Sequence, residues 1–218
     1  MTEAAGDRRP LTSRDSRWAQ AMARRMAGWS ITPNQISQAS MVAAALAGGC
    51  FWWAGQEAGA SRVILLLAAA LFCQIRLLCN LFDGMVAVEG GKASADGPFW
   101  NEFPDRVADL LIFVGAGYGV GLPELGFAAG AFAVLTAYVR ELGRANGLAS
   151  DFSGPMAKPH RMATLTAAAV VSIFAPLWGG RDEILVVALI AITLGAALTV
   201  LRRASRIIAG LKASKQAS

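Results

Sequence analysis

The chain has 218 residues, of which 55% are hydrophobic and only 16% are charged, and its formal net charge is +5. Soluble globular domains carry about 25% charged residues, so this composition argues against an ordinary soluble enzyme and indicates an integral membrane domain. A soluble all-helical core is the alternative. The net positive charge does not indicate a nucleic-acid partner, because the Lys and Arg residues cluster at the ends of apolar runs and in the tails, as at a membrane surface.

The first part of the chain is predicted to lie outside the membrane. Residues 1–12 are polar and are expected to be disordered, whereas residues 13–29 are expected to form an amphipathic helix. The large apolar side chains of this helix fall within one narrow arc at the helical period: Trp18, Met22, Met26 and Trp29. Arginines flank that arc, which is typical of a helix lying in the interface of an anionic membrane.

Six apolar runs follow, and most approach the ~20 residues that a helix needs to cross a bilayer. The predicted fold class is therefore an all-α, polytopic membrane protein with six transmembrane helices and an N-terminal interfacial amphipathic helix. Residues 13–206 form the membrane domain, and residues 207–218 form a basic C-terminal tail. The predicted spans are 35–54, 61–82, 100–121, 124–143, 162–178 and 183–201.

The connections between these spans differ in charge. The short segments after the first, third and fifth spans hold almost no basic residues, whereas the N-terminal region, the 83–99 and 144–161 loops and the C-terminal tail hold most of them. By the positive-inside rule, both termini and these two loops face the cytoplasm. We therefore expect a multi-pass protein of the cell (inner) membrane, surrounded by membrane lipids.

The stretch "CNLFDGMVAVEGGKASADGPFWNEFPDRVAD", from Cys79 to Asp109, interrupts the apolar pattern. On helices, Asn80 and Asp83 share one face, and Asn101 and Asp105 share another, because residues three and four apart are neighbours. If the two faces meet, four oxygen-bearing side chains converge at the cytoplasmic mouth, where they suit a hard cation such as Mg²⁺. The alternative is that the aspartates cap helices or lie in the headgroup layer.

This stretch resembles the signature of the CDP-alcohol phosphotransferase (phosphatidyltransferase) family, D-x2-D-G-x2-A-R-x8-G-x3-D-x3-D. All the spacings match. The chain departs from the signature at three positions, where Asn80 and Asn101 replace aspartates and Val88 replaces the arginine. The residues that agree with the signature are Asp83, Gly84, Ala87, Gly97 and Asp105.

The resemblance implies an enzyme that transfers a substituted phosphate from a CDP-linked lipid, often CDP-diacylglycerol, to an alcohol acceptor and releases CMP. It implies that Asp105 is the base for the acceptor hydroxyl, and that the protein forms a homodimer. It further implies one or two Mg²⁺ (or Mn²⁺) ions at Asn80, Asp83, Asn101 and Asp105. The nucleotide-binding positions it implies are Asp83, Gly84, Ala87 and Gly97. Because an asparagine carbonyl brings no charge, binding of two ions should be weakened.

A second basic cluster follows the fourth span and precedes the fifth. Its members are Arg140, Arg144, Lys158 and Arg161. Four cations facing the mouth of the site would hold the phosphate of an acceptor such as glycerol 3-phosphate or an inositol phosphate, and basic residues in this region line an acceptor pocket in the family. The alternative is that they are ordinary positive-inside charges in contact with lipid headgroups.

The sequence thus predicts a phospholipid-synthesising transferase, and two other functions remain as rivals. A catalytically impaired family member that binds lipid or acts as a scaffold is favoured by Asn80, Val88 and Asn101. A small transporter is disfavoured, because the polar residues gather at one membrane face and no charged path crosses the midplane.

The predicted topology can be tested by cysteine labelling in a background that lacks the native cysteines. Lys92→Cys lies in a loop that we expect in the cytoplasm, so an impermeant maleimide should react with it only after the cells are permeabilised. Gln56→Cys is the matched control in an opposite loop and should react in intact cells. Labelling of the position-92 variant in intact cells would show that the orientation is inverted.

Overall fold

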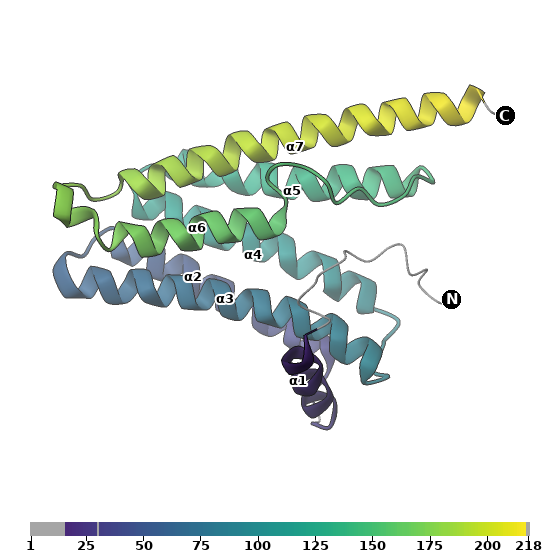
Figure 1. Ribbon diagram of the computed structural model, residues 1–218, viewed down its shortest axis with the longest axis horizontal. Helices are drawn as coiled ribbons and strands as arrows, with labels where there is room; N and C mark the ends of the chain where they lie inside the picture. Colours follow the sequence, from purple (N-terminus) through teal and green to yellow (C-terminus); the bar gives the residue numbers. More distant parts are fainter. Residues whose placement is uncertain (1–15, 30, 217–218) are drawn as a thin grey trace.

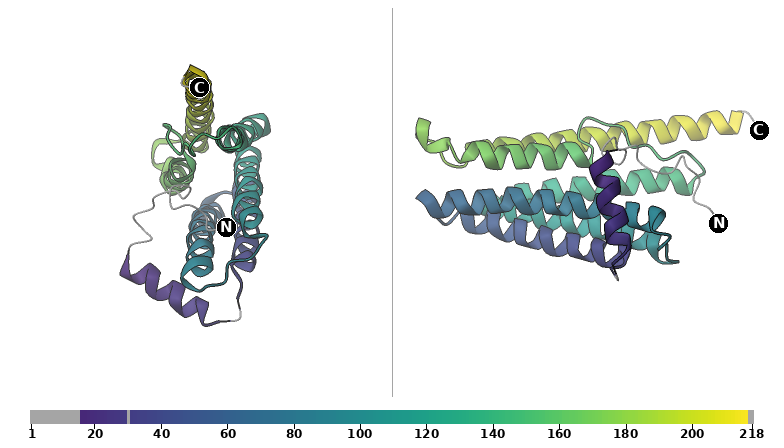
Figure 2. Two further views of the ribbon diagram at one scale, coloured as in Figure 1. Left: turned by 90° about the vertical axis from the view of Figure 1, so that its right-hand side faces the viewer. Right: turned by 60° about the horizontal axis from the view of Figure 1, so that its bottom comes forward.

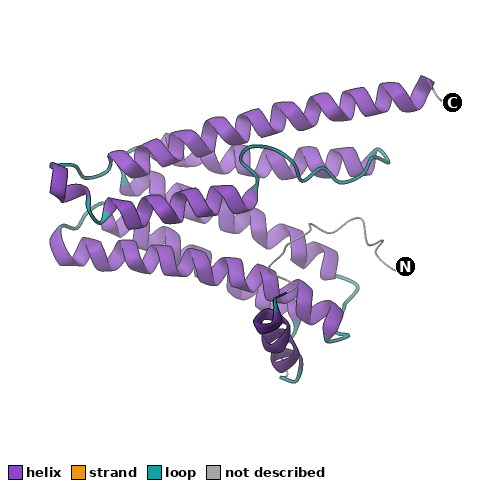
Figure 3. Ribbon diagram, viewed as in Figure 1, coloured by secondary structure: helices purple, strands orange, loops and turns teal. Residues whose placement is uncertain are grey.

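The computed structural model describes residues 16–29 and 31–216, and the segment 1–12 that we expect to be disordered lies outside the described residues. Within the described ranges every regular element is helical (Figures 1 and 3). The elements are α1 (Arg17–Ala27), α2 (Pro33–Ala54), α3 (Gly59–Glu89), α4 (Gly97–Gly119), α5 (Pro123–Ala145), α6 (Lys158–Ser172), a short 3-10 helix (Ala175–Trp178) and α7 (Glu183–Gln216).

Local sequence signals explain where several helices begin. Thr32 caps α2 in a capping box: its hydroxyl accepts a hydrogen bond from the Gln35 backbone N–H, and the Gln35 side chain accepts one from the Thr32 N–H. A proline stands in the first turn of α2, α4, α5 and α6, where its missing N–H leaves no helical hydrogen bond unmade.

The six predicted apolar runs coincide with α2 to α7, but three of the predicted ends differ from the structure. α3 continues past 82 to Glu89, and α7 continues past 201 to Gln216, so the predicted tail is, up to Gln216, a continuation of α7. α6 instead ends at Ser172. The predictions placed helix ends where hydropathy falls, whereas the Ala, Lys and Arg residues beyond 201 sustain a helix irrespective of hydropathy.

α2 to α7 run alongside one another and close into a ring (Figures 1 and 2). α2 packs between α3 and α4, α5 packs between α4 and α7, and α6 packs between α7 and α3. The 90–96 and 146–157 loops lie at the same end of the bundle as the end of α7, and we call this the basic end. The loops between α2 and α3, between α4 and α5, and between α6 and α7 lie at the opposite end, the far end.

α2 and α4 approach each other along a seam of glycines. A Cβ atom added at Gly48 would overlap the carbonyl group of Leu111. One added at Gly115 would overlap the backbone of Gly48, and one added at Gly119 would overlap that of Phe51. The two backbones therefore touch directly, which small residues allow in tightly packed membrane helices.

Arginines tie the loops of the far end together. The Arg62 guanidinium donates to the backbone oxygen of Ala54 at 2.8 Å, to that of Arg181 at 2.9 Å and to the carboxylate of Asp182 at 2.7 Å. Arg181 in turn donates to the backbone oxygen of Gly55 at 2.6 Å. These bonds fasten the start of the α2–α3 connection to the segment that precedes α7.

α1 lies across the bundle instead of along it (Figure 2). Ala19 and Ala23 are fully buried, and α1 contacts α3, where the Trp18 and Phe82 rings meet edge to face with their centroids 6.0 Å apart. Trp18 and Met22 remain 53% and 42% exposed on the predicted apolar arc. The structure thus confirms a helix within 13–29, and its position in a membrane interface stays a prediction.

Membrane-spanning capacity differs among the helices. Among the described residues, three helices are long and apolar enough to cross a membrane, judged by length and composition: α3, α5 and α7. α2 and α4 have 22 and 23 residues, but α2 carries polar residues in its first turn and α4 carries Glu102, Asp105, Arg106 and Asp109, and α6 has only 15 residues.

The glycine seam predicts a position-specific effect on stability. Gly48→Ala forces α2 and α4 apart and should lower the free energy of unfolding by about 1–3 kcal/mol, the usual cost of overpacking. Gly49→Ala is the matched control, because a Cβ atom there meets nothing within 4 Å. It should leave stability unchanged or raise it slightly. Thermal unfolding of the purified protein in detergent would measure both, and equal shifts would contradict the prediction.

Candidate active site

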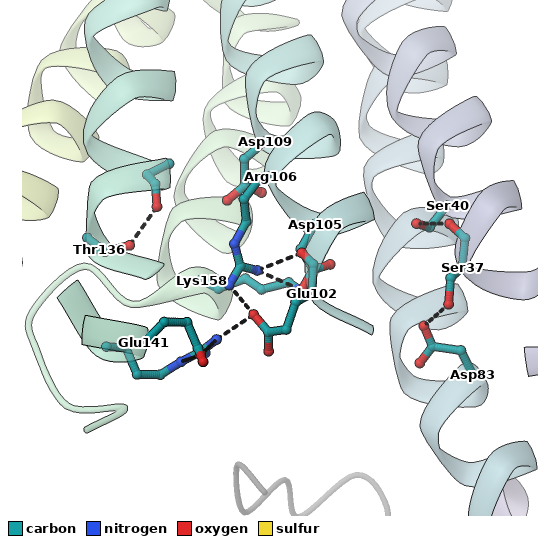
Figure 4. Close-up of polar contacts among 12 residues, drawn as sticks. Ser37, Ser40, Asp83, Glu102, Asp105, Arg106, Asp109, Thr136, Glu141 and Lys158 are labelled. Carbon is teal, nitrogen blue, oxygen red and sulfur yellow. Dashed lines mark hydrogen bonds and ion pairs between the residues drawn. The ribbon is translucent and has the colours of Figure 1, made fainter. Parts of the chain in front are cut away.

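Polar side chains of three helices converge toward the basic end of the ring. Figure 4 shows Asp83 of α3 on one side, Asp105 and Asp109 of α4 at the centre, and Lys158 at the start of α6 beside Asp105. Asp83 lies where α3 continues beyond the predicted span, and Lys158 is the first residue of α6. The site is therefore assembled from helix segments whose positions depend on the packing of the ring.

Asp83 is buried and faces α2. Its carboxylate accepts a hydrogen bond of 2.7 Å from the Ser37 hydroxyl (Figure 4). One turn earlier on α3, Asn80 has a buried side-chain nitrogen with no hydrogen-bond partner. The oxygen and nitrogen of an amide exchange places by rotation, so Asn80 can turn its oxygen into the same space. The two residues therefore offer oxygen atoms from one helix face.

Asp105 is surrounded by cations. The Lys158 ammonium contacts its carboxylate directly. Arg76 Nη2 lies 3.5 Å from Oδ1, and Arg106 Nη1 lies 3.8 Å from Oδ2. Both carboxylate oxygens of Asp105 thus face basic side chains.

Asp109, one turn further along α4, is paired with two buried arginines. Its carboxylate oxygens lie 2.8 Å from Arg76 on α3 and 2.8 Å from Arg161 on α6. Arg161 also donates to the Thr136 hydroxyl and to the backbone oxygen of Met156, each at 3.1 Å. Since both of its oxygens are engaged, Asp109 serves the structure and is not available to a ligand.

A pocket lined by five basic and two acidic side chains opens beside Asp105. The Arg140 guanidinium is held there by Glu102 at 2.5 Å and Glu141 at 2.8 Å, and it lies over the Phe152 ring at 5.0 Å from the centroid. Guanidinium groups fixed in this way recognise phosphate with good geometry. The pocket is lined by Asp105, Arg106, Asp109, Ala133, Thr136, Ala137, Arg140, Phe152, Lys158, Arg161 and Arg203.

The structure brings together three of the four basic residues predicted to hold the acceptor: Arg140, Lys158 and Arg161. Arg144 does not line the pocket; its side chain is 47% exposed and lies 3.7 Å from the Glu141 carboxylate. Sequence reasoning missed Arg106 and Arg203. The usable signal for Arg106 was its place next to Asp105, and for Arg203 it was the continuation of the helical pattern beyond 201.

The residues predicted to bind metal and nucleotide differ in how deeply they are buried and in whether they lie near one another. Asp83 and Asp105 are close enough to interact electrostatically, and Asn80 is partly buried, whereas Asn101 is exposed. Three small residues are predicted to bind the nucleotide: Gly84, Ala87 and Gly97. None of them lines the pocket, and their role stays a prediction.

The donor set fits one hard cation. Within residues 16–29 and 31–216, no three His, Cys, Asp or Glu side chains are grouped so as to hold a metal ion. Mg²⁺, however, needs only one or two protein oxygens and completes its shell with water and substrate phosphates, which Asn80 and Asp83 can accommodate. Asp105 adds little to this set, since Lys158 and Arg76 already balance its charge.

Comparison with solved structures shows which fold this is. The chain is similar to the Mycobacterium tuberculosis phosphatidylinositol phosphate synthase with CDP-DAG bound, at a TM-score of 0.73 and 20% identity over 88% of this chain and 94% of the other. It is equally similar to the same synthase in complex with manganese and citrate, at a TM-score of 0.72 and 19% identity over 87% and 88%. No family model and no curated protein matches the sequence. The likeness therefore establishes the fold.

The pairing of Asp109 predicts a large loss of stability on mutation. Asp109→Asn leaves Arg76 and Arg161 buried without their shared counter-charge and should lower the free energy of unfolding by about 3–5 kcal/mol. The matched control is Glu141→Gln, at a carboxylate that is 41% exposed. Its loss should stay below about 1 kcal/mol. Denaturant unfolding in detergent micelles would compare the two, and similar losses would show that Asp109 is not the anchor described.

Proposed function

We propose that this chain is a membrane transferase of phospholipid synthesis, a CDP-alcohol phosphatidyltransferase. It moves a phosphatidyl group from a CDP-linked lipid such as CDP-diacylglycerol to an alcohol and releases CMP. The observation that carries this proposal is that Asp105, a carboxylate of the variant signature, lines a pocket with five cations, and that Asp83, the other signature carboxylate, interacts with it electrostatically. The likeness in fold to a synthase solved with CDP-DAG bound supports the choice of donor.

The acceptor in this proposal carries a phosphate, as glycerol 3-phosphate or an inositol phosphate does. Arg106, Arg140 and Arg203 bring positive charge to the pocket from three different helices, and Glu102 and Glu141 hold Arg140 in place. The pocket adjoins Asp105, so an acceptor phosphate bound in it would leave the acceptor hydroxyl near that carboxylate.

The chemistry follows from the position of Asp105. Its carboxylate accepts the proton of the acceptor hydroxyl, the hydroxyl oxygen attacks the lipid-bearing phosphorus, and the bond from that phosphorus to CMP breaks as CMP takes the electron pair. Lys158 and Arg76 favour the ionised form of Asp105, so the base is present but modest in strength. Small residues at Gly84, Ala87 and Gly97 leave room for the nucleotide.

One divalent cation, Mg²⁺ or Mn²⁺, completes the proposed site. Asn80 and Asp83 would hold it, and when bound it would supply positive charge for the diphosphate of the donor. The manganese complex of the structurally similar synthase supports a divalent ion of this class.

The proposed topology has six membrane spans, α2 to α7, with α1 in the interface. The alternation of loops between the two ends of the ring supports it, as does the apolar character of α3, α5 and α7. The basic end and the site then face the cytoplasm at the inner membrane, and the protein works as a homodimer, as the family resemblance implies.

A second candidate function is that of an impaired family member that binds lipid without turnover. The ion pair of Asp105 with Lys158, together with the asparagines at positions 80 and 101, favours it. Measured CMP release separates the two functions.

If Asp105 is the base, the protein needs it for CMP release. Asp105→Asn keeps the size of the side chain but removes the base, and CMP release should fall by at least about 10²-fold. Glu57→Gln, a change at a half-buried residue in the α2–α3 loop of the far end, is the control and should retain activity. Purified protein would be assayed with CDP-diacylglycerol and a panel of alcohols, followed by mass spectrometry of the products. A wild type that is silent with every acceptor would favour the impaired relative instead.

The cationic pocket predicts which arginines bind the acceptor. Arg140→Gln removes a fixed guanidinium and should raise the KM for a phosphorylated acceptor about tenfold or more, in line with hydrogen bonds to charged groups. Arg144→Gln removes the same charge outside the pocket and should change that KM little. The KM for the CDP-lipid should stay constant in both. Equal effects of the two variants would argue that the cations act through general surface charge.

A further inference from the structure

We propose that Lys158 is a built-in cation that replaces a second divalent ion in this site, so that the protein binds one metal ion where the signature of the family provides for two. The inference rests on the proposed function, because it concerns the same carboxylates. The observation behind it is the direct contact between the Lys158 ammonium and the Asp105 carboxylate.

Charge balance in the site supports a single divalent ion. The signature provides four carboxylates, and this chain keeps only Asp83 and Asp105, because positions 80 and 101 are asparagines. Lys158 and Arg76 already balance the charge of Asp105, which leaves the charge of Asp83 for one divalent cation. A second such ion would stand as uncompensated charge beside Lys158, and like charges a few ångströms apart repel each other strongly in a partly dry site.

The surrounding arginines strengthen this repulsion. Arg76 is completely buried, and its Nη2 lies 3.5 Å from Asp105 and 2.8 Å from Asp109. Its Nε and Nη1 atoms are buried without a hydrogen-bond partner. Arg76 therefore adds positive charge on the Asp105 side of the site, and a metal ion arriving there would be repelled by it.

Contacts made by the first turn of α6 hold Lys158 in position. Lys158 is the first residue of α6, and Arg161, three residues later, is bound to Asp109, Thr136 and the backbone oxygen of Met156. This turn of α6 is thus tied to α4 and α5. The ammonium is supplied by a fixed helix start and needs no rearrangement to reach Asp105.

The two sides of the site are consequently different. Among the described residues, Asp83 accepts hydrogen bonds from the neutral Ser37 hydroxyl and from the Gly84 N–H, and Asn80 beside it has a buried nitrogen without a hydrogen-bond partner, so this side can accept a cation. The Asp105 side already holds one. The asparagines at positions 80 and 101 thus lower the negative charge of the site, and Lys158 supplies positive charge on its Asp105 side.

The number of bound Mn²⁺ ions tests this inference. The full-length protein in detergent would be titrated with Mn²⁺ and followed by electron paramagnetic resonance. We expect one ion per wild-type chain. In Lys158→Gln we expect a second ion, bound at least about tenfold more tightly than any second ion in the wild type, with a spectrum that shows spin coupling between the two. Lys158→Met repeats the test with an apolar side chain.

Arg140→Gln is the matched control, because it removes a pocket cation that pairs with Glu102 and Glu141 and not with Asp105. It should leave the count at one. Two ions in the wild type, no ion in the wild type, or one ion in both folded Lys158 variants would each overturn the inference. CMP release is measured separately: a wild type that turns over with two ions refutes only this inference, whereas one that binds a single ion but is inert refutes only the proposed activity.

Discussion

The arrangement of the basic end depends on one carboxylate that is shared by two arginines. Asp109 on α4 meets Arg76 on α3 and Arg161 on α6, and all three side chains are buried. Removing two guanidinium groups from water costs several kcal/mol for each, and a shared, well-placed counter-ion offsets much of that cost. The three helices are consequently held in one register around the site, and the start of α6 is held with them.

This register gives the site two unlike halves. Because α2 packs between α3 and α4, Asp83 turns toward a hydroxyl of α2, while Asp105 turns toward the lysine of α6. The carboxylate of Asp83 has a neutral hydrogen-bond partner, whereas that of Asp105 is in an ion pair with Lys158. A pocket of guanidinium groups adjoins the half that contains Asp105. Negative charge therefore dominates on the Asp83 side of the site, and positive charge dominates in the pocket.

Much of this fold follows from the sequence, and the pairing of charges does not. Runs of apolar residues indicate where α2 to α7 lie, and the prolines and Thr32 mark helix starts. The helix ends at Glu89 and Gln216 were missed because hydropathy falls before helix propensity does. Spacing along α3 and along α4 shows which polar residues share a face of each helix, so it predicted that Asp83 and Asp105 lie near each other if the two faces meet. The contact of Asp105 with Lys158 depends on α6 docking beside α3, a tertiary fact that no spacing contains.

The far end of the bundle has a different consequence. Arg62 and Arg181 fasten the loops there to one another through backbone oxygens and Asp182, whereas the pocket opens at the basic end. Under the proposed function and topology, the donor lipid would arrive and the product lipid would depart on the same side of the membrane. Newly made phospholipid would accumulate in a single leaflet, and the growth of the bilayer as a whole would depend on a separate protein that moves lipids across it.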